Sequence, residues 1–211
     1  MLLSGCEADR PVKPGPDPIE PPASADEVID HLAMAYRTMD RDSFDPLLAN
    51  DPEHAAEFSF FLAGHPTGET SWGYGEEERI HRRMFTGQHV AGEYAIPPEY
   101  RMQAINVALT KITDWAEPAG IYSDTNPEGL AREKWKAVEA RFSTHVFFDT
   151  HTDNDFLVED EAIFTVIEDL EKAGTEPGRF LLLHWQDIDG DYSVVQMADR
   201  SWGEIKSLYR R

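Results

Sequence analysis

The residues with the most obvious capacity for chemistry lie in the segment HVFFDTHTDND, which runs from residue 145 to residue 155. Histidine and carboxylate side chains are common metal ligands, and this stretch offers His145, Asp149, His151, Asp153 and Asp155. However, strand alternation puts His145 on a polar, outward face, and the other four fall where a hairpin turn is expected. Aspartate and asparagine serve turn geometry. We therefore expect a turn here, with no metal site and no cofactor.

Asp160 is a second candidate, because it is the one charged side chain on an otherwise apolar strand face. That face consists of Phe156, Val158, Asp160, Ala162, Phe164 and Val166. A carboxyl group among aromatic side chains should have a raised pKa, which is the state that a general acid or base needs. The alternative is a hydrogen bond to Thr144, opposite Asp160 in the hairpin, at the wet mouth of a pocket. We favour this second interpretation.

Three further side chains could contribute to a site. Alternation puts His184 on one strand face with Phe180 and Leu182, but both faces of that strand begin apolar, so whether His184 points into a cavity stays open. Tyr36 could offer a hydroxyl group from a helix, and we expect His81 to pack where another helix meets the sheet. Asp160 with His184, and with Tyr36 as a donor, is the only acid–base set that the sequence suggests.

Helical spacing dominates the first part of the chain. Ser24 and Glu27 form a capping-box pattern ahead of a helix over about 25–39. Asp42 can cap a second, shorter helix that contains Phe44, Leu47 and Leu48. After a short strand over 57–63, a third helix is expected over 76–86, with Gly87 at its end.

Strand patterns follow. The alternation of Ile105, Val107 and Leu109 slips at Ile112, which suggests a β-bulge. Long strands are expected over 135–148, 156–168 and 180–188, with a loop over 117–130 and a closing helix from about residue 202. In the first of these strands Val138, Ala140, Phe142, Val146 and Phe148 should face inward, and the hairpin should place Arg141 and His145 near Glu161 and Glu159. The layout is α+β, with helices on one face of an antiparallel sheet.

Composition limits the partners and the chemistry. The 211 residues include 40 acidic and 19 basic side chains, for a net charge of −21, which repels phosphate backbones and makes nucleic acid a poor partner. Cys6 is the only cysteine, so an intramolecular disulfide is impossible. Zinc-binding, P-loop, dinucleotide-binding and nucleophile-elbow motifs are all missing from the sequence.

The N-terminal stretch LSGC, at residues 3–6, resembles the lipobox of bacterial lipoproteins. In that family a signal peptide is cut before the cysteine, which carries the lipid; the basic and most of the apolar parts of such a peptide do not precede it here. Six prolines between Pro11 and Pro22 then predict an extended spacer of roughly 50 Å. We divide the chain into a lipobox remnant (1–6), a tether (7–24) and a folded domain (25–211), and expect a lipid anchor on Cys6 at the bacterial cell envelope, facing the periplasm or the exterior.

The order of elements over 25–211 resembles the NTF2-like (SnoaL-like) cone fold. The pieces AYRTMDRDSF, SWGYGEEERIHRRMF, HWQDI and SWGEIKSLYR are similar to those of an uncharacterised group of bacterial lipoproteins with that fold. The resemblance implies a curved antiparallel sheet, about three N-terminal helices on its concave face, a short C-terminal helix and a cavity, open at one end, for a small apolar ligand. The cavity-lining residues would be Tyr36, Phe142, Thr144, Asp160, Phe164 and His184.

Three functions stay open at this point. The first is a lipid-tethered cone domain that binds a small molecule or is structural, and does not catalyse. The second is an isomerase-, hydratase- or cyclase-like enzyme that uses Asp160 with His184 or Tyr36. The third is a module that forms a homodimer through the outer sheet face. We prefer the first, because an acid–base enzyme needs two titratable groups that converge on one cavity and the sequence provides a single inward carboxylate.

Overall fold

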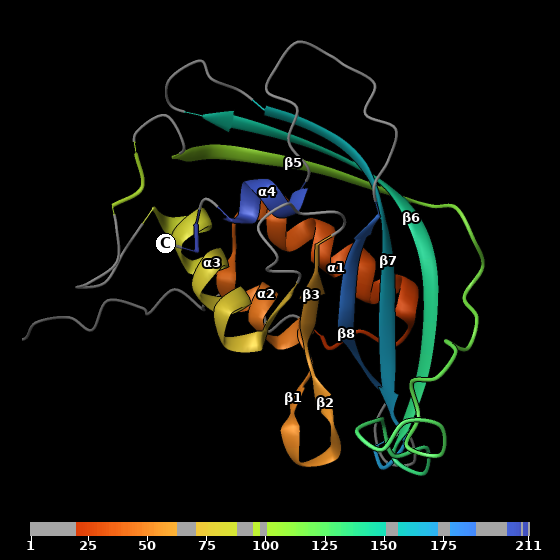
Figure 1. Cartoon of the computed structure of the whole chain (residues 1–211). Helices are drawn as coiled ribbons and strands as arrows, with labels where there is room; N and C mark the ends of the chain where they lie inside the picture. Colours follow the sequence, from red (N-terminus) through yellow and green to blue (C-terminus); the bar gives the residue numbers. More distant parts are fainter. Residues whose placement is uncertain are drawn as a thin grey trace, which may run out of the picture.

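Figure 1 shows a computed structural model of the chain, which describes residues 20–62, 71–87, 95–97, 101–150, 156–172, 178–188, 202–207 and 209–210. Cys6, the lipobox remnant and the tether up to residue 19 lie outside the described residues, as do His151, Asp153 and Asp155 of the turn.

The first helix, α1 (Ala25–Thr38), begins as its capping pattern predicts. The Ser24 hydroxyl accepts from the backbone N–H of Glu27 at 3.2 Å, and the Glu27 carboxylate accepts from the N–H of Ala23 at 2.8 Å. Met39, with a φ of 52°, ends the helix in the left-handed region. The cap sets the residue at which α1 begins, and the buried apolar face sets which side of the helix packs against the sheet.

The other helices of the described residues are α2 (Arg41–Phe44), α3 (Tyr74–Thr86) and α4 (Trp202–Ser207), with 3-10 turns η1 (Asp45–Leu47) and η2 (Pro52–His54). Asp40, rather than the expected Asp42, caps α2, because its carboxylate reaches the N–H of Asp42 at 3.0 Å. Gly87 ends α3 with a φ of 65°, where an L side chain would be strained.

Six strands form one mixed sheet in the order β4-β3-β8-β7-β6-β5. They are β3 (Ser59–Phe61), β4 (Ser71–Gly73), β5 (Met102–Lys111), β6 (Trp135–Thr150), β7 (Phe156–Asp169) and β8 (Arg179–Ile188). All pairs are antiparallel except β3 with β8, and a separate hairpin joins β1 (Asn50–Asp51) to β2 (Ala56–Glu57). The long strands β6 and β7 bend around α1 and α4, so that the helices lie inside the curve of the sheet (Figure 1). The predicted α+β cone with helices on its concave face is confirmed.

The β6–β7 hairpin has the predicted register. Thr144 pairs with Asp160, and His145 with Glu159. Phe142 and Val146 are buried on the concave face, whereas Arg141 on the outer face forms an ion pair with Glu161. His145 Nδ1 lies 3.3 Å from the Glu159 carboxylate. Alternation along β6 therefore separates the two faces as predicted.

Two register predictions are wrong. The bulge in β5 lies between Met102 and Ala104 rather than before Ile112, which follows the strand and is 49% exposed. On β8, Leu182 pairs with Val166 and His184 with Thr165, so Leu183 is an extra residue in the ladder. An extra residue reverses the alternation that follows it. His184 therefore faces outward, while Trp185 and Asp187 face the helices.

The sheet carries apolar side chains on both faces. The larger core lies between the helices and the concave face and includes Tyr36, Phe142, Phe164 and Trp185. The smaller core lies on the outer face, where the chain from Ala116 to Lys134 folds back over the sheet; its buried members are Ala49, Ala56, Tyr122, Leu130, Trp135, Ala137, Ile167, Leu181 and Leu183. Both faces of β8 are therefore covered, as its two apolar faces predicted.

Candidate functional site

Aromatic side chains fill the centre of the concave face, where a ligand cavity was expected. The ring centroids of Phe142 and Phe164 lie 5.3 Å apart, and those of Phe164 and Trp185 lie 4.9 Å apart. Tyr36 of α1 meets Trp185 edge-on at 6.2 Å. These rings are buried and pack against one another, so they form a core rather than the lining of an open cavity.

Beside these rings, His81 of α3 links two buried hydrogen-bonding partners. Its Nδ1 lies 2.9 Å from the backbone oxygen of Glu77, so Nδ1 carries the proton and donates. The hydroxyl of Tyr36 therefore donates to Nε2. Burial and the nearby Lys206 ammonium lower the pKa of His81 well below 6.5, and the ring is neutral.

A fully buried ion pair lies next to His81. The carboxylate of Glu77 accepts from the Lys206 ammonium and from the indole N–H of Trp72. Lys206 also lies 4.1 Å from the ring centroid of Phe60 and 4.0 Å from that of Trp185, a cation–π arrangement. Burial lowers the pKa of Lys206, and the Glu77 carboxylate opposes that effect. The buried ammonium group of Lys206 is thus compensated by the Glu77 carboxylate and by two aromatic rings.

Asp187 is a further buried ionisable group of this region. Its carboxyl group accepts from the Trp185 indole at 3.1 Å and from the backbone N–H of Gly203 at 2.8 Å. Burial, and after it the Asp160 carboxylate, raise the pKa of Asp187 to about 8. Asp187 is therefore mostly protonated at neutral pH, and it attaches β8 to the start of α4.

The structure divides the predicted site residues between the two faces of the sheet. Tyr36, Phe142, Thr144, Asp160 and Phe164 are all buried within the curve of the sheet. His184 lies on the outer face, beside Phe61. Because the sheet separates Asp160 from His184, the acid–base pair that the sequence suggested does not assemble.

Little in the sequence indicates that Glu77, His81, Lys206 and Asp187 are buried together. Glu77 and His81 are four residues apart on the same side of α3 as Ile80 and Met84, which places both polar groups on the apolar face. That spacing could have identified them as buried. Lys206 and Asp187 could not have been identified, since α4 shows no pattern that orients Lys206 and the β8 bulge reverses the alternation before Asp187.

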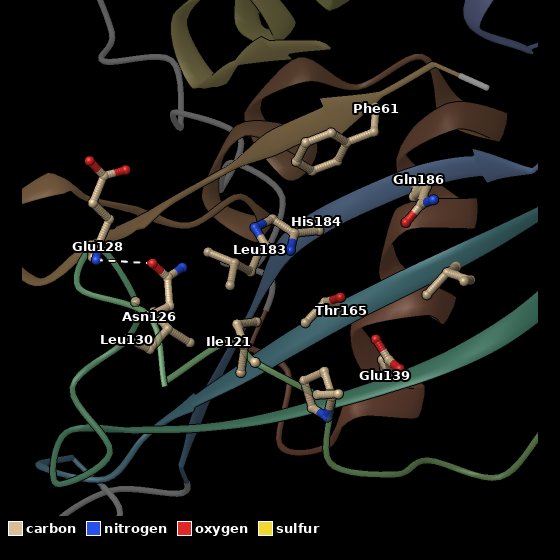
Figure 2. A pocket seen from close by; sticks show the side chains of 16 residues that line it. Phe61, Ile121, Asn126, Glu128, Leu130, Glu139, Thr165, Leu183, His184 and Gln186 are labelled. Carbon is tan, nitrogen blue, oxygen red and sulfur yellow. Dashed lines mark hydrogen bonds between the residues drawn. The ribbon is translucent and has the colours of Figure 1, made fainter. Parts of the chain in front are cut away.

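The outer face carries an open groove of about 320 Å³ between the sheet and the segment 118–130 (Figure 2). Phe61, Leu183 and Ile121 provide apolar surface, and Thr165, His184 and Gln186 of the sheet provide polar groups. Figure 2 shows Glu128 and Glu139 at opposite ends of this groove, with Leu183 and Thr165 between them. The groove combines apolar walls with a few polar groups, which is the usual composition of a small-molecule site.

Backbone pairing holds the segment that forms one wall of the groove. Ala116 and Glu139 exchange two backbone hydrogen bonds, at 3.0 and 2.7 Å, and the N–H of Ala137 donates to the Tyr122 hydroxyl at 2.8 Å. Gly129 approaches the backbone so closely that a Cβ atom there would lie 2.6 Å from the oxygen of Ile121. This wall therefore requires glycine at position 129.

His184 lies in the groove as an uncharged side chain. Its ring meets that of Phe61 edge-on, with centroids 5.4 Å apart. Burial lowers the pKa of His184 to about 4, so the imidazole is neutral at physiological pH. A neutral imidazole has one N–H donor and one nitrogen acceptor to offer to a ligand.

Within the described part of the chain, no group of three or more histidine, cysteine, aspartate or glutamate side chains is gathered that could hold a metal ion. The helices of that part include none with the length and apolar character needed to cross a membrane. The homodimer predicted through the outer face stays a prediction.

Comparison with known proteins gives matches in structure but not in sequence. No family model and no curated protein matches the chain. The chain is similar to the crystal structure of a conserved protein from Planctomyces limnophilus, at 11% identity over 77% of this chain and 94% of the other, with a TM-score of 0.48. It is also similar to a protein of the NTF2-like family from Streptomyces avermitilis (13% identity, 78% and 94% covered, TM-score 0.45). A third is an NTF2-like protein with a cystatin-like fold from Novosphingobium aromaticivorans (9% identity, 86% and 84% covered, TM-score 0.36). NTF2-like proteins are thus among the similar structures, as the sequence resemblance predicted.

Proposed function

We propose that this protein is a lipid-anchored protein of the bacterial cell envelope whose folded domain binds a small molecule, without catalysis, in the outer groove. The observation that carries the proposal is the contrast between the two faces of the sheet. Phe142, Phe164 and Trp185 occupy the concave side, whereas an open groove of about 320 Å³ lies on the convex side.

The chemistry of the groove favours binding over catalysis. General acid–base catalysis needs groups whose pKa values lie near the working pH. His184, with a pKa of about 4, is a weak base that stays unprotonated at neutral pH. The titratable groups with strongly raised or lowered pKa values on the concave side, such as Asp187 and His81, are engaged with neighbouring side chains and backbone.

The anchor is proposed from the N-terminal sequence. Ser4 and Gly5 have the small side chains that precede a lipidated cysteine in the lipobox pattern, and Cys6 follows them. The proline-rich tether after Cys6 would hold the folded domain away from the bilayer. We place the domain on the periplasmic or exterior side of the membrane, where lipoproteins of this pattern are found.

A panel of small molecules, screened by the shift each causes in melting temperature, tests the binding function. We expect some compounds to raise the melting temperature of the protein and to be recovered chemically unchanged after incubation. Gln186→Trp should abolish these shifts, because Gln186 lines the groove and an indole there would fill it. Gln103→Trp, an exposed position on β5, is the matched control and should keep them. Shifts that persist in Gln186→Trp would place binding elsewhere, and conversion of a compound would contradict a non-catalytic role.

A further inference from the structure

We infer that the outer groove selects a ligand that carries an ammonium group on a small apolar body. This inference rests on the proposed function, because it names the chemical class that the groove binds. It depends on three features of the groove: the sign of its charges, the position of Glu139, and the apolar surface between its two ends.

The charges of the groove have one sign. Its sixteen lining residues include Glu128 and Glu139 but no lysine or arginine. His184 adds no positive charge at neutral pH, since burial lowers its pKa to about 4. The net charge of the chain is −21, so the surrounding field has the same sign as the groove. An anionic ligand would be repelled at both ends of the groove, and a cationic ligand would be attracted.

Glu139 is the carboxylate placed to receive the cation. It lies on β6 opposite Thr165, which in turn lies opposite His184, so the three side chains form a row across the outer face of three strands. Other acidic residues of this face have basic partners: Glu161 pairs with Arg141, and the Glu159 carboxylate lies 3.3 Å from Nδ1 of His145. Among the residues that the structure describes, no ion pair involves the Glu139 side chain. A partly shielded carboxylate without a counter-charge favours a ligand that brings one.

The surface next to Glu139 suits an apolar group. Leu183 and Ile121 lie between the two glutamates, and the ring of Phe61, which is 36% exposed, borders the groove from β3. Thr165 and the neutral His184 supply hydrogen-bonding groups without charge. A ligand whose ammonium group lies at Glu139 would therefore place its apolar body along Leu183 and Phe61.

Three probes of nearly equal size test this selection: 2-phenylethylamine, 2-phenylethanol and 3-phenylpropanoate. Dissociation constants would be measured by NMR titration of the full chain carrying Cys6→Ala, at about 20 and 150 mM salt, with the amides of Thr165 and His184 as reporters. We expect the amine to bind at least about 5-fold more tightly than the alcohol at low salt, the preference to shrink at higher salt, and the carboxylate not to bind. Glu139→Gln should make the amine bind no better than the alcohol. Glu133→Gln removes one exposed charge outside the groove and should change nothing.

The possible outcomes distinguish a failure of the ammonium selection from a failure of the proposed binding function. Equal binding of all three probes at Thr165 and His184 would overturn the ammonium selection and leave a binding groove in place. Tight amine binding that survives in Glu139→Gln would overturn the role of Glu139. If none of the probes binds, the inference is wrong, and the comparison of Gln186→Trp with Gln103→Trp on the compound panel then decides whether the groove binds anything.

Discussion

Lys206 of α4 and Glu77 of α3 form a fully buried ion pair between residues 129 positions apart in the chain. The pair connects the last helix to the third within the core of the domain, and the centroids of the Phe60 and Trp185 rings lie 4.1 and 4.0 Å from the ammonium group. The C-terminal helix is therefore part of the closed core, and its removal would leave Glu77 buried without a counter-charge.

Lys206→Met should strongly destabilise the protein. Methionine keeps most of the side-chain volume but leaves the Glu77 carboxylate uncompensated, which costs about 3–5 kcal/mol in a buried pair. Urea denaturation measures the free energy of unfolding. Lys206→Met with Glu77→Gln should recover much of the loss, because a neutral amide still accepts from Trp72 and carries no charge. If the double variant were as unstable as Lys206→Met alone, the loss of stability would come from packing of the Lys206 side chain and not from its charge pairing with Glu77.

Gly203→Ala should also loosen α4. A Cβ atom at Gly203 would lie 1.9 Å from the Leu62 side chain and 2.9 Å from the Asp187 carboxyl oxygen, so the helix must shift. Overpacking of this kind typically costs about 1–3 kcal/mol, which a melting curve detects as a drop of several degrees. Gly75→Ala is the matched control: no atom lies within 4 Å of a Cβ there, and the residue is within α3. Its melting temperature should stay the same or rise. Equal melting temperatures for the two variants would contradict the close approach of α4.

Asp187 should make stability depend on pH. The pKa of the Asp187 carboxyl group is about 8 in the folded protein, against an ordinary value of 3.8 that applies to the unfolded chain. Between these two pH values the folded protein therefore holds one more proton than the unfolded chain. Stability therefore falls as pH rises through this interval, by at most about 1.4 kcal/mol per pH unit. The range from pH 6.5 to 8 is best for the measurement, because the lowered pKa values of His81 and His184 reduce stability only below pH 6.5.

Asp187→Asn should flatten the dependence of melting temperature on pH over that range, even if the loss of one acceptor lowers the melting temperature at every pH. The comparison of slopes isolates Asp187 from other buried groups, such as Lys206, that both proteins share. Parallel slopes for wild type and variant would show that the carboxyl group is ionised in the folded state.

Cys6→Ala should move the protein from the membrane fraction to the soluble fraction. The substitution removes the proposed lipid attachment but touches none of the described core, so the melting temperature of the purified protein should stay unchanged. Cell fractionation with immunoblotting of the chain, expressed from its own gene, makes the measurement. Ser4→Ala keeps a small side chain before the cysteine and should leave the protein in the membrane fraction. Membrane retention of Cys6→Ala would refute the anchor.

The regular parts of the fold were predictable from local patterns. Ser24 and Glu27 identify the start of α1 because capping involves neighbours in the sequence. The β6–β7 register, which pairs Thr144 with Asp160, follows from alternation and one turn. In these segments the side chains that decide the structure are close together in the chain.

The site was less predictable, because it depends on irregular and long-range features. The extra residue at Leu183 leaves no mark in an apolar strand, yet it moves His184 from the concave face to the outer groove. The groove also needs the segment 118–130 folded back over the sheet, held by contacts such as Ala137 with Tyr122, which no local pattern reveals. The interior could be expected to hold Phe142 and Phe164, but their mutual contact depends on how tightly the sheet curves.

The location of the binding site is the central claim, and an NMR footprint tests it most directly. Amide and methyl shifts of the uniformly labelled chain would be recorded during titration with 2-phenylethylamine. We predict shifts at Phe61, Thr165 and His184, on the outer face, and none at Tyr36, Phe142 or Phe164. Shifts confined to those three interior residues, with the outer groove unchanged, would contradict the account.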